Sequence, residues 1–481
     1  MISRKKERTA RIGTFAVAHA KYWEQFEGLY ENIMGYHSDF CDIVKTNGVE
    51  LVDFGMIDSS EKAYETVKKM QAASLDLVFC NMVTYATSSV FAPILRELDR
   101  PIVLTALQPL EALDYDKANT FMQLENDSIC SVPEFTGVAI RLGKKVYDVI
   151  IGGLYNDDEA KHDIAEWCDI AKVLHDLKGA RMGLMGHVME AMYDMHADPT
   201  AVSAAFGLHI PLIEVDDVID LYNTVTEEET AAKIKLIEAE FDTPEPKSDP
   251  VTSKLTEEDK IQAAKSAVAL DKLVEKYNLT GLAYYYEGSE GSLHRKLAST
   301  FIVGNSILNA QGIPMCGEYD IKTCIAMLIM DRLDIGGSFA ELHPFDFRED
   351  FILIGHDGPH HLRIAEGKPV LRSLKKYHGK PGSGASVEFK LKEGPITMLG
   401  ITQTANGKFK FVIGEGMSRA GAIPPTGNTN TRGFFEPTTK EFIKKWVMVG
   451  PTHHYALGIG HHASTIAKIA DVLGIDYEIV K

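Results

Sequence analysis

Alternating strand and helix patterns over the first two thirds of the chain constrain its fold more than any other feature. The apolar, partly β-branched run Arg11–Val17 is typical of a strand buried on both faces. Further strand patterns follow at residues 49–54, 75–79 and 101–105, and residues 59–73 form an amphipathic helix pattern. Strands that alternate with helices predict a doubly wound parallel sheet.

The same alternation restarts after Lys178. Apolar strand patterns recur at residues 181–185, 210–214, 282–286 and 313–316. A long helix pattern over residues 256–276 opens with Thr256 and Asp259, three residues apart, as in a capping box. We therefore expect a second parallel-sheet domain after the first.

From about Gly336 the pattern changes to half-buried strands. Residues 396–402 and 408–413 are two such strands, and the Asn406-Gly407 dipeptide between them favours a tight hairpin turn. A closing helix pattern spans residues 463–473. The last part of the chain should therefore be rich in antiparallel β-structure.

A chain of 481 residues is too long for one hydrophobic core. The predicted fold is α/β, with two Rossmann-like doubly wound domains at residues 1–175 and 176–332 and a β-rich C-terminal domain at residues 333–481.

The net charge of −18 disfavours nucleic acid and anionic membrane surfaces as partners, because both repel an acidic protein. The basic start of the chain is not followed by an apolar stretch, so no signal peptide is expected, and no run is long enough to span a membrane. The six cysteines are scattered without a CxxC pair, which favours reduced core residues and a cytoplasmic location.

Three segments carry candidate chemistry. Glu318 directly follows a buried strand, where open α/β sheets bind ligands. Glu341 and His356 bracket an apolar strand and can face one cavity. The pair His453-His454 follows Gly-Pro-Thr and enters an apolar segment. Taken alone, Glu318, Glu341 and His356 are better explained as solvated acids or a hydrogen-bonded histidine, whereas the pair His453-His454 is equally compatible with metal binding.

Two carboxylates and two imidazoles together suit one divalent ion, Mn²⁺ or Co²⁺ rather than Mg²⁺, and the lack of a thiolate argues against structural zinc. Such an ion leaves two positions for sugar oxygens and acts as a Lewis acid on the carbonyl. A neighbouring carboxylate can then move a proton between C1 and C2. This is the chemistry of aldose–ketose isomerisation.

The same segments resemble the superfamily of L-arabinose isomerase and L-fucose isomerase. Cys-Gly-Glu318-Tyr-Asp resembles the family's Gly-Glu-Gly-Asp segment, and Ser-Phe-Ala-Glu341 resembles its Ser-Phe-Met-Glu segment. Gly-His356 resembles the Gly-Ser-His segment, and Gly-Pro-Thr-His453-His454 resembles the Gly-Gly-Ala-His-His segment. The order and approximate spacing of the four segments agree with the family.

The resemblance implies a specific set of roles. Glu318, Glu341, His356 and His454 would bind Mn²⁺, with Co²⁺ or Mg²⁺ as other possibilities. Both glutamates would be catalytic, as the acid/base pair of an intramolecular oxidoreductase that works through an enediolate. The resemblance also implies a homo-oligomer, trimer or hexamer, with each site completed by a neighbouring subunit.

Departures from the family lie in the segments that contact the sugar. Arabinose isomerases carry Gln-His-Leu-Tyr-Gly after the first strand, where this chain has Ala-His19-Ala-Lys-Tyr22-Trp23. We therefore expect a substrate other than L-arabinose. The candidate substrate-binding residues are His19, Lys21, Tyr22, Trp23, Tyr85, His187 and His453. A basic cluster of His19, Lys21 and Arg295 would suit a C6-modified hexose such as sulfoquinovose, a 6-sulfonated glucose.

Two functions of other classes remain open. Paired Rossmann-like domains also form sugar-binding proteins, which need no set of two carboxylates and two histidines. A metal-dependent hydrolase or lyase is the other alternative, although the chain has no Gly-x-Ser-x-Gly elbow, His-Glu-x-x-His helix or clear phosphate loop. Ketose formation without addition of water would separate an isomerase from a lyase.

Overall fold

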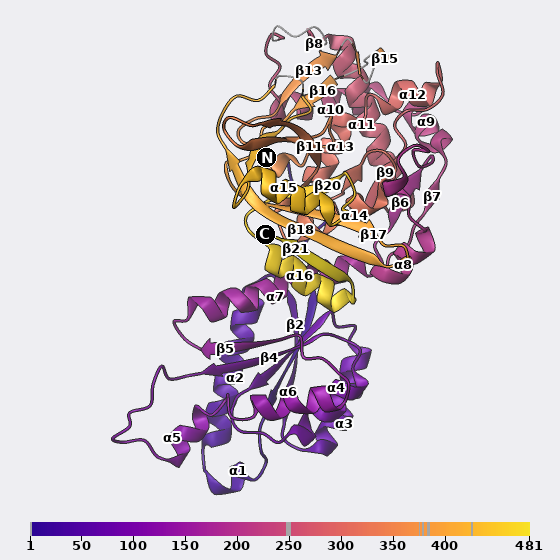
Figure 1. Ribbon diagram of the computed structural model, residues 1–481. Helices are drawn as coiled ribbons and strands as arrows, with labels where there is room; N and C mark the ends of the chain where they lie inside the picture. Colours follow the sequence, from indigo (N-terminus) through magenta and orange to yellow (C-terminus); the bar gives the residue numbers. More distant parts are fainter. Residues whose placement is uncertain (1, 247–251, 375, 378–379, 382–384, 425–426) are drawn as a thin grey trace. The chain divides into compact units, whose positions relative to one another are not determined.

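The computed structural model describes residues 2–246, 252–374, 376–377, 380–381, 385–424 and 427–481 (Figure 1). The chain divides into two compact units, one formed by Arg8–Asp176 and the other by Met1–Glu7 together with Leu177–Lys481. The finer division into three domains remains a prediction.

The unit Arg8–Asp176 is built on one parallel sheet with the strand order β2-β1-β3-β4-β5. Its strands are β1 Arg11–Val17, β2 Glu50–Ile57, β3 Leu77–Met82, β4 Ile102–Gln108 and β5 Asp148–Gly153. Its helices are α1 Tyr22–Gln25, α2 Leu29–Lys45, α3 Ser60–Ala72, η1 Ser88–Val90, α4 Ala92–Glu97, α5 Thr120–Glu125, α6 Val132–Arg141 and α7 Asp158–Leu177.

Helices cover both faces of this sheet, which explains why its central strands are continuously apolar. Side chains of α3, α4 and α6 share one core cluster with β1, β3 and β4. On the other face Phe40 of α2 packs edge-on against Phe79 of β3, with 5.8 Å between the ring centroids. The predicted parallel α/β fold is thus confirmed for this unit.

The other unit begins with a short parallel sheet of strand order β10-β9-β6-β7. Its strands are β6 Met182–Met185, β7 Leu212–Ile213, β9 Gly281–Tyr284 and β10 Met315–Cys316. The accompanying helices are η2 Tyr193–Met195, α8 Pro199–Phe206, α9 Val215–Asn223, α10 Glu227–Glu240, α11 Glu257–Tyr277, α12 Leu293–Ala298, α13 Ile302–Ala310 and α14 Ile321–Arg332. The capping box at Thr256 and Asp259 is formed as predicted.

A closed antiparallel barrel follows. Its strand order is β17-β20-β11-β12-β19-β18, and β17 also pairs with β18, which removes the open edges. These strands are β11 Gly336–Asp346, β12 Phe351–Gly355, β17 Gly394–Gln403, β18 Phe409–Arg419, β19 Thr431–Phe434 and β20 Tyr455–Ile459, and β21 Asp476–Val480 joins β18 in parallel. The expected Asn406-Gly407 turn joins β17 to β18, with Gly407 at a φ of +80°.

Smaller elements complete this unit. They are η3 Leu362–Ile364, α15 Thr439–Met448, α16 Ala463–Leu473, the three-stranded sheet of β8 Thr252–Ser253, β13 Val370–Leu374 and β16 Ala385–Glu388, and the pair β14 Lys376–Tyr377 and β15 Lys380–Pro381. The β-rich C-terminal part is therefore confirmed, including the closing helix at its predicted position.

The description "Rossmann-like" is not confirmed. The order 2-1-3-4-5 is a common doubly wound order, but dinucleotide-binding folds have the six-stranded order 3-2-1-4-5-6. The second parallel sheet has four short strands. What the structure shows is therefore a mixed α/β protein with parallel sheets and an antiparallel barrel.

All six cysteines are free thiols, and five are buried as predicted. Cys130 is exposed, because it lies in the turn just before α6, and the prediction of a core position was wrong for it. Among the described residues, the helices are too short or too polar to cross a bilayer.

Candidate active site

Strand pairing in the barrel places three of the predicted ligands at the same level. Glu341 of β11 lies opposite Gly355, the residue before His356. Ala340, the residue before Glu341, lies opposite Tyr455, the residue after His454. Three neighbouring strands, β12, β11 and β20, therefore each bring one side chain to one end of the barrel.

Glu318 arrives from the parallel sheet through a sharp turn. It follows β10, and both Glu318 and Tyr319 have a positive φ, of 59° and 62°. Such angles are unfavourable for residues with side chains, so the surrounding structure must hold them. Tyr319 donates its N–H to the carbonyl of Tyr284 at 2.9 Å. The helix α14 that follows packs against β11, β17 and β20, and this packing holds the turn next to the barrel.

The four predicted ligands meet in two overlapping groups. The Oε1 atom of Glu318 lies 3.6 Å from Nε2 of His356, and its Oε2 atom lies 3.7 Å from Nε2 of His454. Ligand atoms of Glu341, His453 and His454 lie within 4.8 Å of one another, as do those of Glu318, His356 and His454. These separations are too long for hydrogen bonds but suit side chains that share one ion.

The group of Glu318, His356 and His454 is buried, and burial of their polar atoms is energetically unfavourable unless a ligand pairs with them. Glu318, His356 and His454 are only 6%, 8% and 0% exposed. Oε2 of Glu318 and Nε2 of His454 nevertheless have no hydrogen-bond partner. Because buried polar atoms are normally paired, a cation between these atoms would satisfy them. The residues present therefore fit a divalent metal ion.

The electrostatics of Glu318 agree with this reading. Burial alone would raise the pKa of its carboxyl group, but the neighbouring imidazoles of His356 and His454 outweigh burial and hold the pKa below its usual value. Burial lowers the pKa of His454. A charged carboxylate and a neutral imidazole are the forms that bind a metal.

Asp320 orients His454, a role that the sequence analysis did not assign. Its Oδ2 atom lies 3.1 Å from Nδ1 of His454, and its Oδ1 atom caps α14 by accepting the N–H of Thr323. A proton on Nδ1 leaves Nε2 of the same ring free to bind a metal. Burial opposes the charge on Asp320, but the hydrogen bond from His454 still lowers its pKa.

Replacing Asp320 by asparagine is expected to weaken metal binding by about 10–100-fold, the usual effect of losing such a supporting carboxylate. Asparagine still caps a helix well, so α14 should remain intact. The metal dissociation constant of each purified protein, measured by calorimetry alongside circular dichroism, checks this. An unchanged dissociation constant would show that Asp320 serves only the helix.

Asp194 holds His453, the first histidine of the pair. Its Oδ2 atom lies 2.6 Å from Nδ1 of His453 and also accepts the His453 backbone N–H at 2.9 Å. Burial alone would lower the pKa of His453, but Asp194 outweighs it and raises the pKa. Asp194 thus favours the charged form of His453, and the predicted contact of His453 with the substrate remains a prediction.

The other candidate sugar-binding residues are placed as follows. In the unit Arg8–Asp176, the ring centroids of Tyr22 and Tyr85 lie 5.3 and 6.3 Å from that of His19, so these three residues form an aromatic cluster. Lys21 is exposed. Trp23 donates its ring N–H to Asp58 at 2.9 Å, which suggests a structural role.

His187 lies in the other unit, against the ring of Tyr285 at a centroid distance of 4.0 Å. Both line a pocket of about 520 Å³ beyond the ends of β6 and β9. Arg295 belongs to α12 of this unit, whereas His19 and Lys21 belong to the Arg8–Asp176 unit. The basic cluster inferred from sequence therefore remains a prediction.

No protein-family model matches the chain. It is similar to L-arabinose isomerase 1 of Bacillus licheniformis, 21% identical over 88% of this chain and 84% of the relative. The L-arabinose isomerases of Oceanobacillus iheyensis and Herpetosiphon aurantiacus are each 22% identical, over 83% and 91% of this chain and 83% and 87% of the relatives. A periplasmic solute-binding protein of Actinobacillus succinogenes with bound D-allose matches at a TM-score of 0.18 and 9% identity, covering 68% of this chain and 92% of that one, too low to bear on the fold.

Parallel α/β sheets, a closed antiparallel barrel and a buried cluster of carboxylates and histidines define the class: an α/β protein with a candidate metal centre at the end of a barrel. Within that class, the chain is similar over most of its length to the L-arabinose isomerases, at 21–22% identity, as the resemblance of its motifs predicted.

Proposed function

We propose that this chain is a metal-dependent aldose–ketose isomerase that acts through an enediolate intermediate. The observation that carries the proposal is the buried group of Glu318, His356 and His454, with unpartnered ligand atoms, next to Glu341. The names of its relatives, L-arabinose isomerases, support the same reaction class.

Glu318, Glu341, His356 and His454 would hold the metal ion, which we propose to be Mn²⁺, with Co²⁺ and Mg²⁺ as alternatives. When bound, the ion polarises the carbonyl of the sugar and stabilises negative charge on its oxygens.

The proton transfers fall to the two glutamates. The side chain of Glu341 is 32% exposed, so a sugar can reach it, whereas Glu318 is buried. Glu341 would take a proton from one carbon and return it to the next, and Glu318 would transfer protons to and from the sugar oxygens. The ring of Phe339 lies 4.4 and 4.3 Å from the rings of His356 and His454 and excludes water from that side.

The substrate is proposed to be an aldose other than L-arabinose, since the segment from His19 to Trp23 departs from the arabinose isomerase pattern. A C6-modified hexose such as sulfoquinovose is one candidate, although the relatives do not favour it. A non-catalytic sugar-binding protein is likewise not favoured, because its function would not require a carboxylate and histidine cluster of this kind.

Removing the metal is expected to reduce ketose formation to background, and adding Mn²⁺ should restore it. The test uses chelator-treated protein with L-arabinose, L-fucose, D-galactose, glucose and 6-sulfonated glucose, before and after Mn²⁺ is added. Full turnover by the stripped protein would contradict metal dependence. Binding of a sugar without any turnover would favour the binding-protein alternative, and the best substrate would show what the altered segments select.

We also propose a cytoplasmic homo-oligomer, trimer or hexamer, in which neighbouring subunits complete each site. A small-molecule sugar is the expected partner, and the net charge of −18 argues against nucleic acid or anionic membrane. Sedimentation velocity would give the oligomeric state. Loss of specific activity on dilution into the monomer range would support shared sites.

A further inference from the structure

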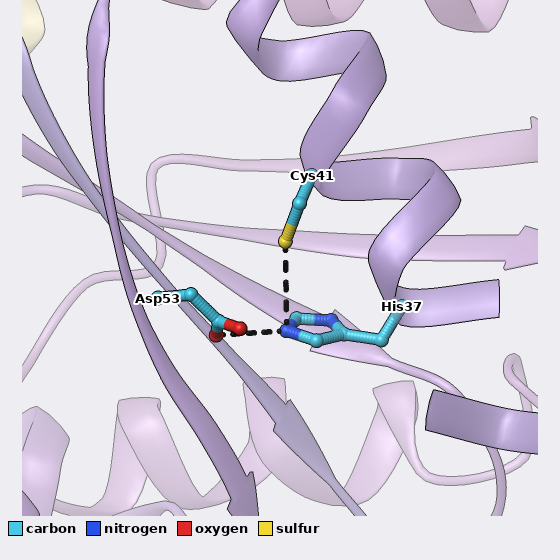
Figure 2. Close-up of side chains that lie close together, drawn as sticks. All are labelled: His37, Cys41 and Asp53. Atoms are coloured by element: carbon cyan, nitrogen blue, oxygen red, sulfur yellow. Dashed lines mark hydrogen bonds and ion pairs between the residues drawn. The ribbon is translucent and has the colours of Figure 1, made fainter. Parts of the chain in front are cut away.

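The unit Arg8–Asp176 contains a second group of potential metal ligands, His37, Cys41 and Asp53 (Figure 2). His37 and Cys41 lie one turn apart on α2, so their side chains point to the same side of the helix. Asp53 comes from β2, at the edge of the sheet. The proposed isomerase reaction uses none of these residues.

All three side chains converge on one point. Nε2 of His37 lies 3.0 Å from Oδ1 of Asp53 and 3.7 Å from Sγ of Cys41, as the dashed lines in Figure 2 show. A ring nitrogen carries at most one hydrogen, so Nε2 can form a good hydrogen bond with Asp53 or with Cys41, but not with both. One cation at this point would satisfy all three donor atoms together.

An irregularity in the sheet aims Asp53 at the helix. The pairing of β1 with β2 shifts register just after Asp53, and Gly55 adopts a φ of +71° there. Gly55 donates its N–H to Oδ1 of Asp53 at 2.8 Å, which fixes the carboxylate. Bulges of this kind turn a side chain away from its regular direction. Because the side chain of Asp53 stays 43% exposed, ions can reach it from solvent.

The far side of the His37 ring is held by Asn81. Its Nδ2 atom lies 3.0 Å from Nδ1 of His37, and Thr105 donates to its Oδ1 atom at 3.1 Å. The two ends of an amide have nearly the same size, so Asn81 can turn over and accept a proton from Nδ1 instead. That exchange frees Nε2 for a metal without moving the ring.

We propose that His37, Cys41 and Asp53 bind one Zn²⁺ ion, with water at the fourth position on the exposed Asp53 side. A thiolate, an imidazole and a carboxylate are ligands that zinc commonly takes, and two negative ligands balance its charge. On binding, the thiol proton passes to solvent, and the single proton of the imidazole moves to Nδ1. The ion would fasten α2 to the edge strand β2.

Without a cation the sulfur is a neutral thiol, because burial raises the pKa of Cys41 to about 12. A bound cation would therefore convert a buried thiol into a thiolate, which spectroscopy can detect. This signal separates the site from the candidate active site, whose four proposed ligands include no cysteine.

The test titrates Co²⁺ into the chelator-stripped, full-length protein and follows the near-ultraviolet absorption of a cobalt–thiolate bond. The wild-type protein should develop this band, and Zn²⁺ should displace it. Cys41→Ser should abolish the band, Asp53→Asn should weaken Co²⁺ binding at least about 10-fold, and Cys130→Ser, a change at the exposed cysteine, should leave the band unchanged.

Two further results keep this test independent of the proposed function. The band should persist in His454→Gln, even though that change is expected to end isomerase activity. Zn²⁺ should also protect Cys41 of the wild-type protein from alkylation, as mapped by mass spectrometry. Absence of the band in the wild type, or its persistence in Cys41→Ser, would overturn the zinc site. If Cys41→Ser does not fold, the band in the wild type and the Co²⁺ affinity of Asp53→Asn test the site instead.

Discussion

Replacing Glu341 by glutamine is expected to lower kcat for ketose formation by about 10²–10⁴-fold, the usual contribution of a general acid/base. An amide cannot accept the proton that Glu341 is proposed to carry, and it is also a poorer metal ligand. The two side chains have nearly the same shape, and Glu341 is partly exposed, so the barrel should fold as before.

The experiment compares kcat and KM of both proteins at saturating Mn²⁺, with thermal unfolding as a check on the fold. Glu393→Gln is the matched control, because Glu393 is an exposed glutamate just before β17 and should retain full activity. Activity of Glu341→Gln close to that of the control would remove Glu341 from the proton transfer. Equal loss of Mn²⁺ binding and of turnover would instead assign it to the metal alone.

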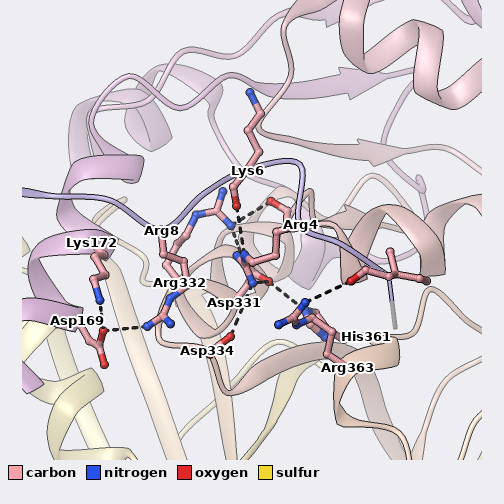
Figure 3. Close-up of polar contacts among 12 residues, drawn as sticks. Arg4, Lys6, Arg8, Asp169, Lys172, Asp331, Arg332, Asp334, His361 and Arg363 are labelled. Atoms are coloured by element: carbon pink, nitrogen blue, oxygen red, sulfur yellow. Dashed lines mark hydrogen bonds and ion pairs between the residues drawn. The ribbon is translucent and has the colours of Figure 1, made fainter. Parts of the chain in front are cut away.

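Replacing Asp331 by asparagine is expected to destabilise the unit Met1–Glu7 with Leu177–Lys481 by about 3–5 kcal/mol, the cost of leaving buried charges without their partner. Asp331 is 1% exposed and contacts Arg4, the fully buried Arg332 and His361 (Figure 3). Nε2 of His361 lies 2.9 Å from its Oδ1 atom. Asparagine keeps the shape but removes the negative charge that these groups require.

The difference in unfolding free energy between the wild type and Asp331→Asn should depend on pH with a definite sign. Burial alone would raise the pKa of Asp331, but His361, Arg332 and Arg4 together hold it well below its ordinary value. A lowered carboxyl pKa stabilises the folded state above the unfolded pKa of about 3.9, and the gain disappears as pH falls towards the folded value. The gap between the wild type and Asp331→Asn should therefore be full at neutral pH and narrow below about pH 4.

Urea unfolding at a series of pH values measures this gap. Asp334→Asn is the matched control, since Asp334 is 48% exposed and lies 3.8 Å from Arg4, and its loss should cost less than about 1 kcal/mol. Equal stability of Asp331→Asn and Asp334→Asn would mean that Arg4, Arg332 and His361 do not need the negative charge of Asp331.

The strands of the parallel sheets could be predicted from the sequence because continuous apolar runs mark them, as in Arg11–Val17, whose bounds agree with the structure. The fifth strand, Asp148–Gly153, was missed because its acidic start and its two glycines hide that signal. Closure of the barrel was not predictable either. It depends on pairing between β17 and β20, which are distant in the sequence, and local patterns do not specify such partners.

For the candidate site, segment resemblance led to Glu318, Glu341, His356 and His454, and the structure places these residues close together. Asp320 was quoted in a motif but given no role, although an acid two residues after Glu318 at a helix start is a usable signal. Asp194 had no local signal, because its contact with His453 spans 259 residues of sequence.

The closed barrel has a consequence for how this protein could diversify. Of the four proposed ligands, Glu341 lies on β11, and His356 and His454 lie directly beside the ends of the neighbouring strands β12 and β20, whose register is held by ladder hydrogen bonds. The residues proposed to touch the sugar lie instead in turns and loops, such as the one at His187, or in the short helix α1. Loops tolerate insertion and exchange far better than paired strands. Mutation can therefore reshape sugar preference while the ligand geometry stays unchanged, so a new specificity does not require a new catalytic centre.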